Sequence, residues 1–270
     1  MNNFWTRAVT GAVFVTVMIG CIWWSFWSMA GLFLVISILG LWEFYSLLEN
    51  ANHHPQKVLG ILTGILIFLF PLNHYIPYIL PLIIFGLFFI ELFRKFENPF
   101  TNIAYTILGF IYISIPFTFL GYGTAYFRET SLGISESYFP NLLLGFFFLV
   151  WANDTFAYLV GISIGKHRLF ERHSPKKSWE GFIGGIICAQ GIAYIISIYF
   201  TELAPIHWLV VALIVSVFGT MGDLVESMFK RSLGLKDSGN ILPGHGGILD
   251  RFDAVLLSAP FVVTYLMLIR

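Results

Sequence analysis

The chain has 270 residues, of which 57% are hydrophobic and only 11% are charged, and its mean hydropathy is +0.81. Charged residues make up about a quarter of soluble globular domains, so this composition excludes that class and indicates a polytopic membrane protein. Lysine plus arginine and aspartate plus glutamate number 15 each, and this balance gives no support for a nucleic-acid partner.

Apolar runs along the chain predict an all-α fold, an integral membrane bundle of helices. A helix needs about 20 mainly apolar residues to cross a bilayer. Runs of roughly this length predict about nine transmembrane helices, at residues 8–27, 29–48, 58–73, 76–93, 102–125, 141–163, 181–200, 206–227 and 254–269. The first run is long for a cleaved signal peptide, and only one basic residue precedes it, so we interpret it as a span.

The lysine and arginine residues predict the orientation of these spans. If the N-terminus is cytoplasmic, only Arg128 and Arg270 lie outside, and the other thirteen lie inside. Cytoplasmic loops of membrane proteins are enriched in these residues. We therefore expect a cytoplasmic N-terminus, an outer C-terminus, and two polar loops, residues 164–180 and 228–253, on the cytoplasmic face.

The character of the spans changes near residue 140. The spans before it are aromatic-rich and almost free of ionisable groups, whereas later spans carry Asp154, Asp223 and Glu226. Ionisable side chains are costly inside a membrane and usually mark function. Residues 1–140 are thus expected to form a scaffold for lipid access or oligomer contacts, and residues 141–270 a catalytic region.

Residues 227–253 form the most polar segment of the second region. Its stretch 243–247, Pro-Gly-His-Gly-Gly, cannot continue a helix, because proline lacks an N–H donor and clustered glycines favour turns. Free backbone N–H groups in such a turn can bind an anion. With Lys230, Arg231, Lys236 and Arg251 around it, the turn is predicted to bind phosphate.

Carboxylates lie at both ends of this segment. Asp250 and Asp253 are three residues apart where the last span begins, and Asp223 and Glu226 lie late in the preceding span. Carboxylates that converge from two helix ends suit Mg²⁺, which prefers a few protein oxygens. The alternative is ion pairing, which we prefer for Glu226 because Lys230 follows four residues later. Asp223 and Asp250 are predicted to be magnesium ligands.

Glycines in the segment 219–222 precede Asp223, and they predict close helix packing there rather than a cationic partner for this carboxylate. Asp154 lies within an apolar run and must face a polar cavity or a partner.

The loop 164–180 is basic and precedes another helix, with Ser178 as its expected N-cap. Lys166, Arg168 and Arg172 favour either a substrate site or a contact with anionic lipid. Lys176 and Lys177 follow a Ser-Pro pair that starts at Ser174, and they would point their donors where a helix N-terminus also points.

The polar residues of both loops resemble the pattern of the phosphatidate cytidylyltransferase family, also called CDP-diacylglycerol synthase. The resemblance covers roughly residues 150–253, and Ser178 departs from it because threonine is expected there. The matching residues are Asp154, Thr155, Ala157, Tyr158, Gly161, Gly165, Lys166, Ser174, Pro175, Lys176, Lys177, Ser227, Lys230, Arg231, Lys236, Asp237, Pro243, His245, Gly246, Gly247, Asp250, Arg251 and Asp253.

The resemblance implies an integral enzyme of the bacterial cytoplasmic membrane, with its active site facing the cytoplasm. It would convert CTP and phosphatidate to CDP-diacylglycerol and pyrophosphate with Mg²⁺, and it would form a homodimer with a second cation such as K⁺. Alternatives are a CTP-dependent lipid-alcohol kinase, which would release CDP, and an ion-coupled transporter, which would leave the basic loop without a purpose.

The resemblance also implies roles for the residues. Asp223 and Asp250 would bind the Mg²⁺ that bridges the triphosphate, and Asp154 and Asp253 would lie beside it or bind a second cation. The expected catalytic residues are Asp223, Asp250, Lys236, Arg251 and Asp253. The expected substrate-binding residues are Asp154, Lys166, Ser174, Lys176, Lys177, Lys230, Arg231, Asp237, His245, Gly246 and Gly247, of which the last three would shape the turn under the pyrophosphate.

Overall fold

The computed structural model describes residues 3–125, 138–235, 238–239 and 246–270, with side chains from residue 8 onward. Over these ranges each predicted span corresponds to one α-helix, so the all-α prediction is confirmed. The helices are α1 (Asn3–Trp24), α2 (Phe26–Asn50), α3 (Lys57–Leu69), α4 (Ile76–Phe93), α5 (Pro99–Ala125), α6 (Pro140–Ile164), α7 (Trp179–Tyr199), α8 (Pro205–Ser232) and α9 (Leu249–Leu268).

Seven helices within the described ranges are long and apolar enough to cross a membrane. The apolar stretches of the first and third helices, Ala8–Trp24 and Lys57–Leu72, are shorter, and the latter includes the 3-10 turn η1 (Phe70–Leu72).

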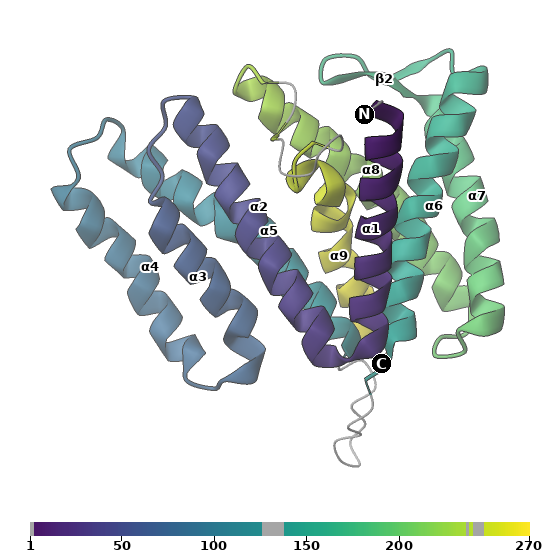
Figure 1. Cartoon of the computed structure of the whole chain (residues 1–270), viewed down its shortest axis with the longest axis horizontal. Coiled ribbons are helices and arrows are strands. Elements are labelled where there is room, and N and C mark those ends of the chain that lie inside the picture. The colour runs from purple at the N-terminus through teal and green to yellow at the C-terminus, as the bar shows by residue number, and fades with distance from the viewer. Residues whose placement is uncertain (1–2, 126–137, 236–237, 240–245) are drawn as a thin grey trace.

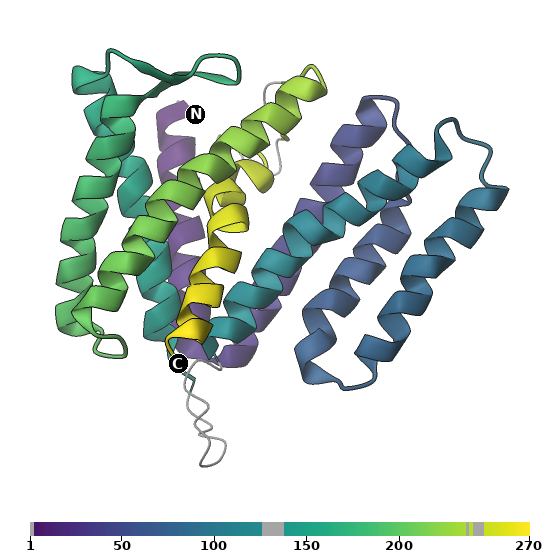
Figure 2. The same ribbon diagram turned by 180° about the vertical axis from the view of Figure 1, so that it is seen from behind.

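The helices run side by side in a broad bundle (Figures 1 and 2). Helices α3 and α4 form one edge and α6 and α7 the other, and α9 packs between α5 and α8. The start of α1, the end of α6, the end of α8 and the start of α9 lie at one end of the bundle, opposite the C-terminus (Figure 1). The loop 164–180 and the described ends of the segment 228–253 therefore lie at the same end of the bundle, as predicted.

Several helix ends and one loop differ from the prediction. Helix α8 continues to Ser232 and α9 begins at Leu249, because hydropathy marks the apolar part of a helix and not its end. Basic residues in the last turn of α8 favour this extension by interacting with the helix dipole. The polar loop forms an antiparallel hairpin of β1 (Arg168–Phe170) and β2 (Ser174–Ser178).

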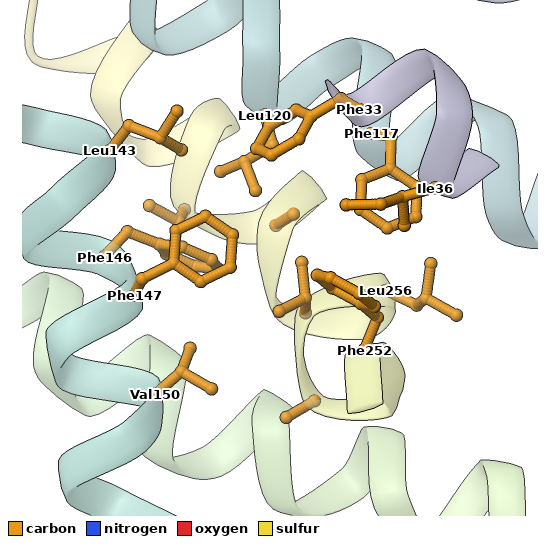
Figure 3. Packing of buried hydrophobic residues seen from close by; sticks show 14 of the residues in the cluster. Phe33, Ile36, Phe117, Leu120, Leu143, Phe146, Phe147, Val150, Phe252 and Leu256 are labelled. Atoms are coloured by element: carbon orange, nitrogen blue, oxygen red, sulfur yellow. The ribbon is translucent and has the colours of Figure 1, made fainter. Parts of the chain in front are cut away.

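Aromatic and aliphatic side chains from α2, α5, α6 and α9 form the core beside the polar end (Figure 3). Phe252 of α9 is buried, and its ring meets the ring of Phe14 from α1 at 5.7 Å and that of Phe117 from α5 at 5.3 Å. These contacts pack α9 against α1 and α5. Residues labelled in Figure 3 are Phe33, Ile36, Phe117, Leu120, Leu143, Phe146, Phe147, Val150, Phe252 and Leu256.

Helices α8 and α9 approach each other through glycine. A Cβ atom on Gly222 would overlap the carbonyl oxygen of Asp253, and one on Gly219 would lie 3.4 Å from Cβ of Ala254. The predicted close packing before Asp223 is confirmed. Small residues at these positions bring the carboxylate-bearing parts of both helices together.

Candidate active site

A pocket of about 240 Å³ lies where α1, α6 and α9 meet. Asp154 of α6 and Asp250, Arg251 and Asp253 of α9 line its polar part. The other wall is formed by Trp151 of α6 and by four residues of α1, which are Thr10, Gly11, Phe14 and Val15. The pocket thus combines carboxylates and a guanidinium with an apolar side. This arrangement can bind a molecule that has a charged group and a hydrocarbon part.

Asp154 stands in α6 and is exposed to this pocket, as its position in an apolar run required. It interacts electrostatically with Lys177, Asp223 and Arg251. The carboxylate of α6 is therefore part of a charged group that also involves the hairpin, α8 and α9.

Lys177 of strand β2 pairs with Asp223 of α8, with 2.6 Å between Nζ and Oδ2. Both side chains are partly exposed. The expectation that Asp223 has no cationic partner is therefore wrong. The hairpin brings Lys177 to α8 because Ser178 caps α7 by accepting a hydrogen bond from the N–H of Gly181, and this cap was predicted.

Lys230 connects α8 to α9 through two carboxylates. Its Nζ lies 2.5 Å from Oε2 of Glu226 and 2.6 Å from Oδ1 of Asp250. The Lys230 and Asp250 side chains are 12% and 13% exposed and Glu226 is 2% exposed, so the pairs are shielded from water. The predicted Glu226–Lys230 pair is confirmed, and the lysine is shared with Asp250.

The second oxygen of Asp250 is held by the turn before α9. Oδ2 accepts hydrogen bonds from the N–H of Gly247 at 3.0 Å and from Oγ of Ser238 at 2.9 Å. Gly246 has φ of +83°, which only glycine adopts readily, and a Cβ there would lie 2.7 Å from the same oxygen. The glycine turn wraps around the Asp250 carboxylate.

Glu43 of α2 belongs to this site, although sequence reasoning assigned it no role. Its carboxylate is buried and accepts hydrogen bonds from the N–H groups of Ile248 at 2.7 Å and Leu249 at 3.2 Å, and from the hydroxyl of Ser238. The signal was a glutamate inside an apolar span. In the predicted turn, 243–247, the described N–H of Gly247 is bonded to Asp250, and the next two N–H groups along the chain, those of Ile248 and Leu249, are bonded to Glu43.

Tyr112 of α5 was also missed. Its hydroxyl is buried, makes no hydrogen bond to a described residue, and interacts electrostatically with Asp253, Glu226 and Asp223. The second oxygen of Glu226, Oε1, is buried without a partner in the same described set. A hydroxyl donor therefore faces the carboxylates from the N-terminal half of the chain.

Other predicted residues lie around this group. Arg231 is exposed and donates from Nη1 to the carbonyl of Leu235 at 3.1 Å. Lys176 is exposed on β2, which begins at Ser174, and Lys166 is exposed between α6 and β1. The structure thus brings Lys177, Lys230 and Arg251 to the carboxylates, and Arg231, Lys166 and Lys176 do not line the pocket. Lys236, Asp237 and His245 lie outside the described residues.

The carboxylates of the described residues do not form a compact magnesium site. Over the described ranges, no group of three or more histidine, cysteine, aspartate or glutamate side chains is close enough to hold a metal ion, and Asp223 and Asp250 have different lysine partners. Charge and chemistry nevertheless fit a divalent cation. Among described residues, five interacting carboxylates face two lysines and one arginine, which leaves two formal negative charges on hard oxygen ligands. These carboxylates are Asp154, Asp223, Glu226, Asp250 and Asp253.

Comparison with known proteins gives consistent matches. A family model described as "Cytidylyltransferase family" matches residues 5–269. Relatives named phosphatidate cytidylyltransferase from Staphylococcus haemolyticus and Staphylococcus aureus are each 50% identical over 124 residues, which is 45% of this chain and 47% of each relative. One from Staphylococcus saprophyticus is 48% identical over the same length and shares. The matched part of the chain spans about half the length of these curated relatives.

Proposed function

Because the chain belongs to the cytidylyltransferase family, we propose that it transfers the cytidylyl group of CTP to phosphatidate and releases pyrophosphate. The names of its relatives support phosphatidate as the acceptor. The observation that carries the proposal is the pocket itself, in which Arg251 and three carboxylates meet an apolar wall formed by α1. Arg251 could bind a phosphate group there, beside an apolar wall that could accept hydrocarbon.

The proposed reaction joins two polyanions. An oxygen of the phosphatidate phosphate attacks the α-phosphorus of CTP, the bond from that phosphorus to the bridging oxygen breaks, and pyrophosphate leaves with the electron pair. The attacking oxygen is already anionic at neutral pH, so no general base is needed. Two unit charges 4 Å apart repel by about 4 kcal/mol at an effective dielectric constant of 20. Charge neutralisation and positioning are therefore the main tasks.

Cations of this chain are suited to these tasks. Arg251 lines the pocket, and its planar guanidinium can bind two phosphate oxygens at once. Lys177 and Lys230 lie at the carboxylates, where each can exchange a carboxylate partner for a phosphate oxygen. We assign Lys166, Lys176 and Arg231, which are exposed, to the capture of either substrate. Lys236 and His245 are assigned to phosphate binding by resemblance alone.

We propose Asp223 and Asp250 as the magnesium ligands, with Asp154 and Asp253 beside them. A carboxylate offers about four lone pairs, so Asp223 keeps several beyond the one used by Lys177, while Asp250, which also accepts from Gly247 and Ser238, keeps about one on Oδ1. A bound Mg²⁺ would neutralise charge on the triphosphate. The chain's own carboxylates hold Lys177 and Lys230 until substrate phosphates compete for them.

A cytoplasmic active site is part of the proposal. The N-terminus and both polar loops lie at one end of the bundle, and thirteen of the 15 lysine and arginine residues would lie on that side (Figure 1). Bacterial relatives support placement in the cytoplasmic membrane. A C-terminal alkaline phosphatase fusion should be active and a C-terminal green fluorescent protein fusion dark; the reverse pattern would refute this orientation.

The resemblance also implies a homodimer and a second cation such as K⁺, and sizing in detergent tests the dimer.

Product analysis tests the reaction. The purified chain in lipid nanodiscs should convert labelled CTP and phosphatidate, with Mg²⁺, into equal amounts of CDP-diacylglycerol and pyrophosphate. Release of CDP with a phosphorylated lipid alcohol would instead indicate a kinase. No nucleotide product, together with cation flux in proteoliposomes, would indicate a transporter.

A further inference from the structure

Glu43 reaches from α2 to the start of α9, across about two hundred positions of sequence. Oε2 accepts from the N–H of Ile248 at 2.7 Å, and Oε1 accepts from the N–H of Leu249 at 3.2 Å and from the Ser238 hydroxyl. The side chain is only 4% exposed. The first N–H groups of a helix have no partner within it, so Glu43 satisfies two donors that α9 leaves free.

Electrostatics favours this contact over an ordinary packing role. A buried carboxylate is stable only when donors or positive charge surround it. The N-terminus of a helix carries a partial positive charge, which favours a carboxylate at this position. The interaction therefore pairs the buried Glu43 carboxylate with the free N–H groups of α9, and each would raise the free energy of the fold if left unpaired. It also fixes the residue at which α9 begins.

Glycines shape the chain around Glu43. A Cβ atom on Gly247 would overlap Oε1 of Glu43 and Oγ of Ser238, and one on Gly239 would lie 3.2 Å from Cδ of Glu43. Gly247 has no positive φ, so space and not backbone conformation requires glycine there. The carboxylate of Glu43 thus determines the shape of the turn that binds Asp250.

Ser238 links Glu43 to Asp250. Its hydroxyl contacts Oε1 of Glu43 and lies 2.9 Å from Oδ2 of Asp250. A hydroxyl has one proton, so Ser238 donates to one of these carboxylates at a time. The position and the charge of Asp250 are in this way coupled to a residue of α2.

We propose that Glu43 is a positioning residue of the active site, which holds the first turn of α9 so that Asp250, Arg251 and Asp253 line the pocket. This inference rests on the proposed cytidylyltransferase function for its activity readout. The rest of α9 is held independently by its buried core side chains, such as Val255, Leu256 and Val262. Loss of Glu43 should therefore disturb the first turn without unfolding the bundle.

The test compares Glu43→Gln with Glu49→Gln. Glu49 lies on the same helix, is exposed, and pairs with Lys57, so it is a matched control. Glutamine keeps the size of Glu43 but replaces one acceptor oxygen with a donor that opposes backbone N–H groups. We expect turnover to fall about 10- to 100-fold, as for residues that orient metal ligands. Glu49→Gln should keep full turnover.

Two further readouts separate positioning from a general loss of folded protein. The Mg²⁺ concentration for half-maximal activity should rise about tenfold in Glu43→Gln, whereas a smaller folded fraction would leave it unchanged. Hydrogen exchange in a peptide covering residues 246–256 should become faster in Glu43→Gln, and this readout does not depend on activity. If Glu43→Gln gives no monodisperse protein, Ser238→Ala takes its place, with the same expected direction in both measurements.

A double-mutant cycle tests the direct contact. Gly247→Ala should reduce turnover strongly in the wild-type background, and less so when Glu43→Ala has removed the carboxylate that its Cβ would meet. Additive effects would overturn the proposal, as would wild-type turnover and Mg²⁺ dependence in Glu43→Gln. If the wild-type chain makes no CDP-diacylglycerol, the proposed function fails, and unchanged exchange in Glu43→Gln would separately refute the positioning role.

Discussion

The Lys177 ammonium lies 2.6 Å from the Asp223 carboxylate, and this pair joins the hairpin to helix α8. Both side chains are partly exposed, so their attraction is screened by water and should contribute less than about 1 kcal/mol to stability. Its importance lies in placing a cation at the carboxylates.

Lys177→Ala should therefore leave the melting temperature in detergent nearly unchanged while raising the KM for CTP or phosphatidate about tenfold. The ammonium lost is the one assigned to a phosphate oxygen, and one charge-assisted hydrogen bond corresponds to about this factor. Steady-state kinetics in mixed micelles measures it. Lys95→Ala removes an exposed lysine after α4 and should change neither constant. If both variants raised KM equally, Lys177 would contribute only to the general surface charge and would not bind a substrate phosphate.

Lys230→Met should be strongly destabilising. The change leaves Glu226 and Asp250 buried without their shared cation, and removing one partner of a buried pair costs about 3–5 kcal/mol. Thermal unfolding in detergent measures the loss. Adding Glu226→Gln to Lys230→Met removes one of the two stranded charges and should restore part of the stability. A double variant no more stable than Lys230→Met would show that Glu226 is not paired in solution.

Asp250→Asn should abolish turnover, by at least about a hundredfold, with expression and oligomeric state unchanged. The amide cannot replace a carboxylate as a magnesium ligand and also loses the charge that holds Lys230. Activity across a Mg²⁺ titration, with EDTA as the reference without metal, measures it. Glu97→Gln changes an exposed residue after α4 and serves as the control. Near-normal activity of Asp250→Asn over the titration would exclude Asp250 as a ligand.

Gly222→Ala should force α8 away from α9, because the added Cβ would overlap the carbonyl oxygen of Asp253. Overpacking of this kind costs about 1–3 kcal/mol, and a shift of Asp253 should reduce turnover as well. Gly191→Ala in α7 meets nothing within 4 Å and should be neutral or slightly stabilising. Melting temperature and turnover of the two variants, measured together, check the contrast. Equal stability would mean that the helices separate without cost.

Hydropathy was sufficient to locate the helices, because an apolar run of about 20 residues has few other stable outcomes in a membrane. It misplaced the end of α8 and the start of α9, where polar helical turns continue beyond the apolar part. The hairpin was missed because short polar strands have no apolar alternation to reveal them. Local spacing did predict the Ser178 cap and the Glu226–Lys230 pair, whose partners are three or four residues apart.

Contacts between residues far apart in the chain could not be predicted from a single sequence. Glu43 and Tyr112 lie in helices that seemed to form only a scaffold, and their partners are more than a hundred residues away. The basic partner of Asp223 was missed for the same reason, since the hairpin that carries Lys177 had not been predicted. The anion-binding turn was predicted at 243–247; its described N–H group on Gly247 binds Asp250, and those of Ile248 and Leu249 just beyond it bind Glu43.

The pocket has walls from both extremes of the chain, residues 10–15 of α1 and residues 250–253 of α9. During synthesis the first helix enters the membrane long before the last one is made, and chains fold from their N-terminal parts first. The acidic side chains of α9 consequently pack against a surface that earlier helices have already formed. Glu43 is part of that surface. A nascent chain still lacking α9 has no complete pocket, so chemical competence begins only after α9 has been made.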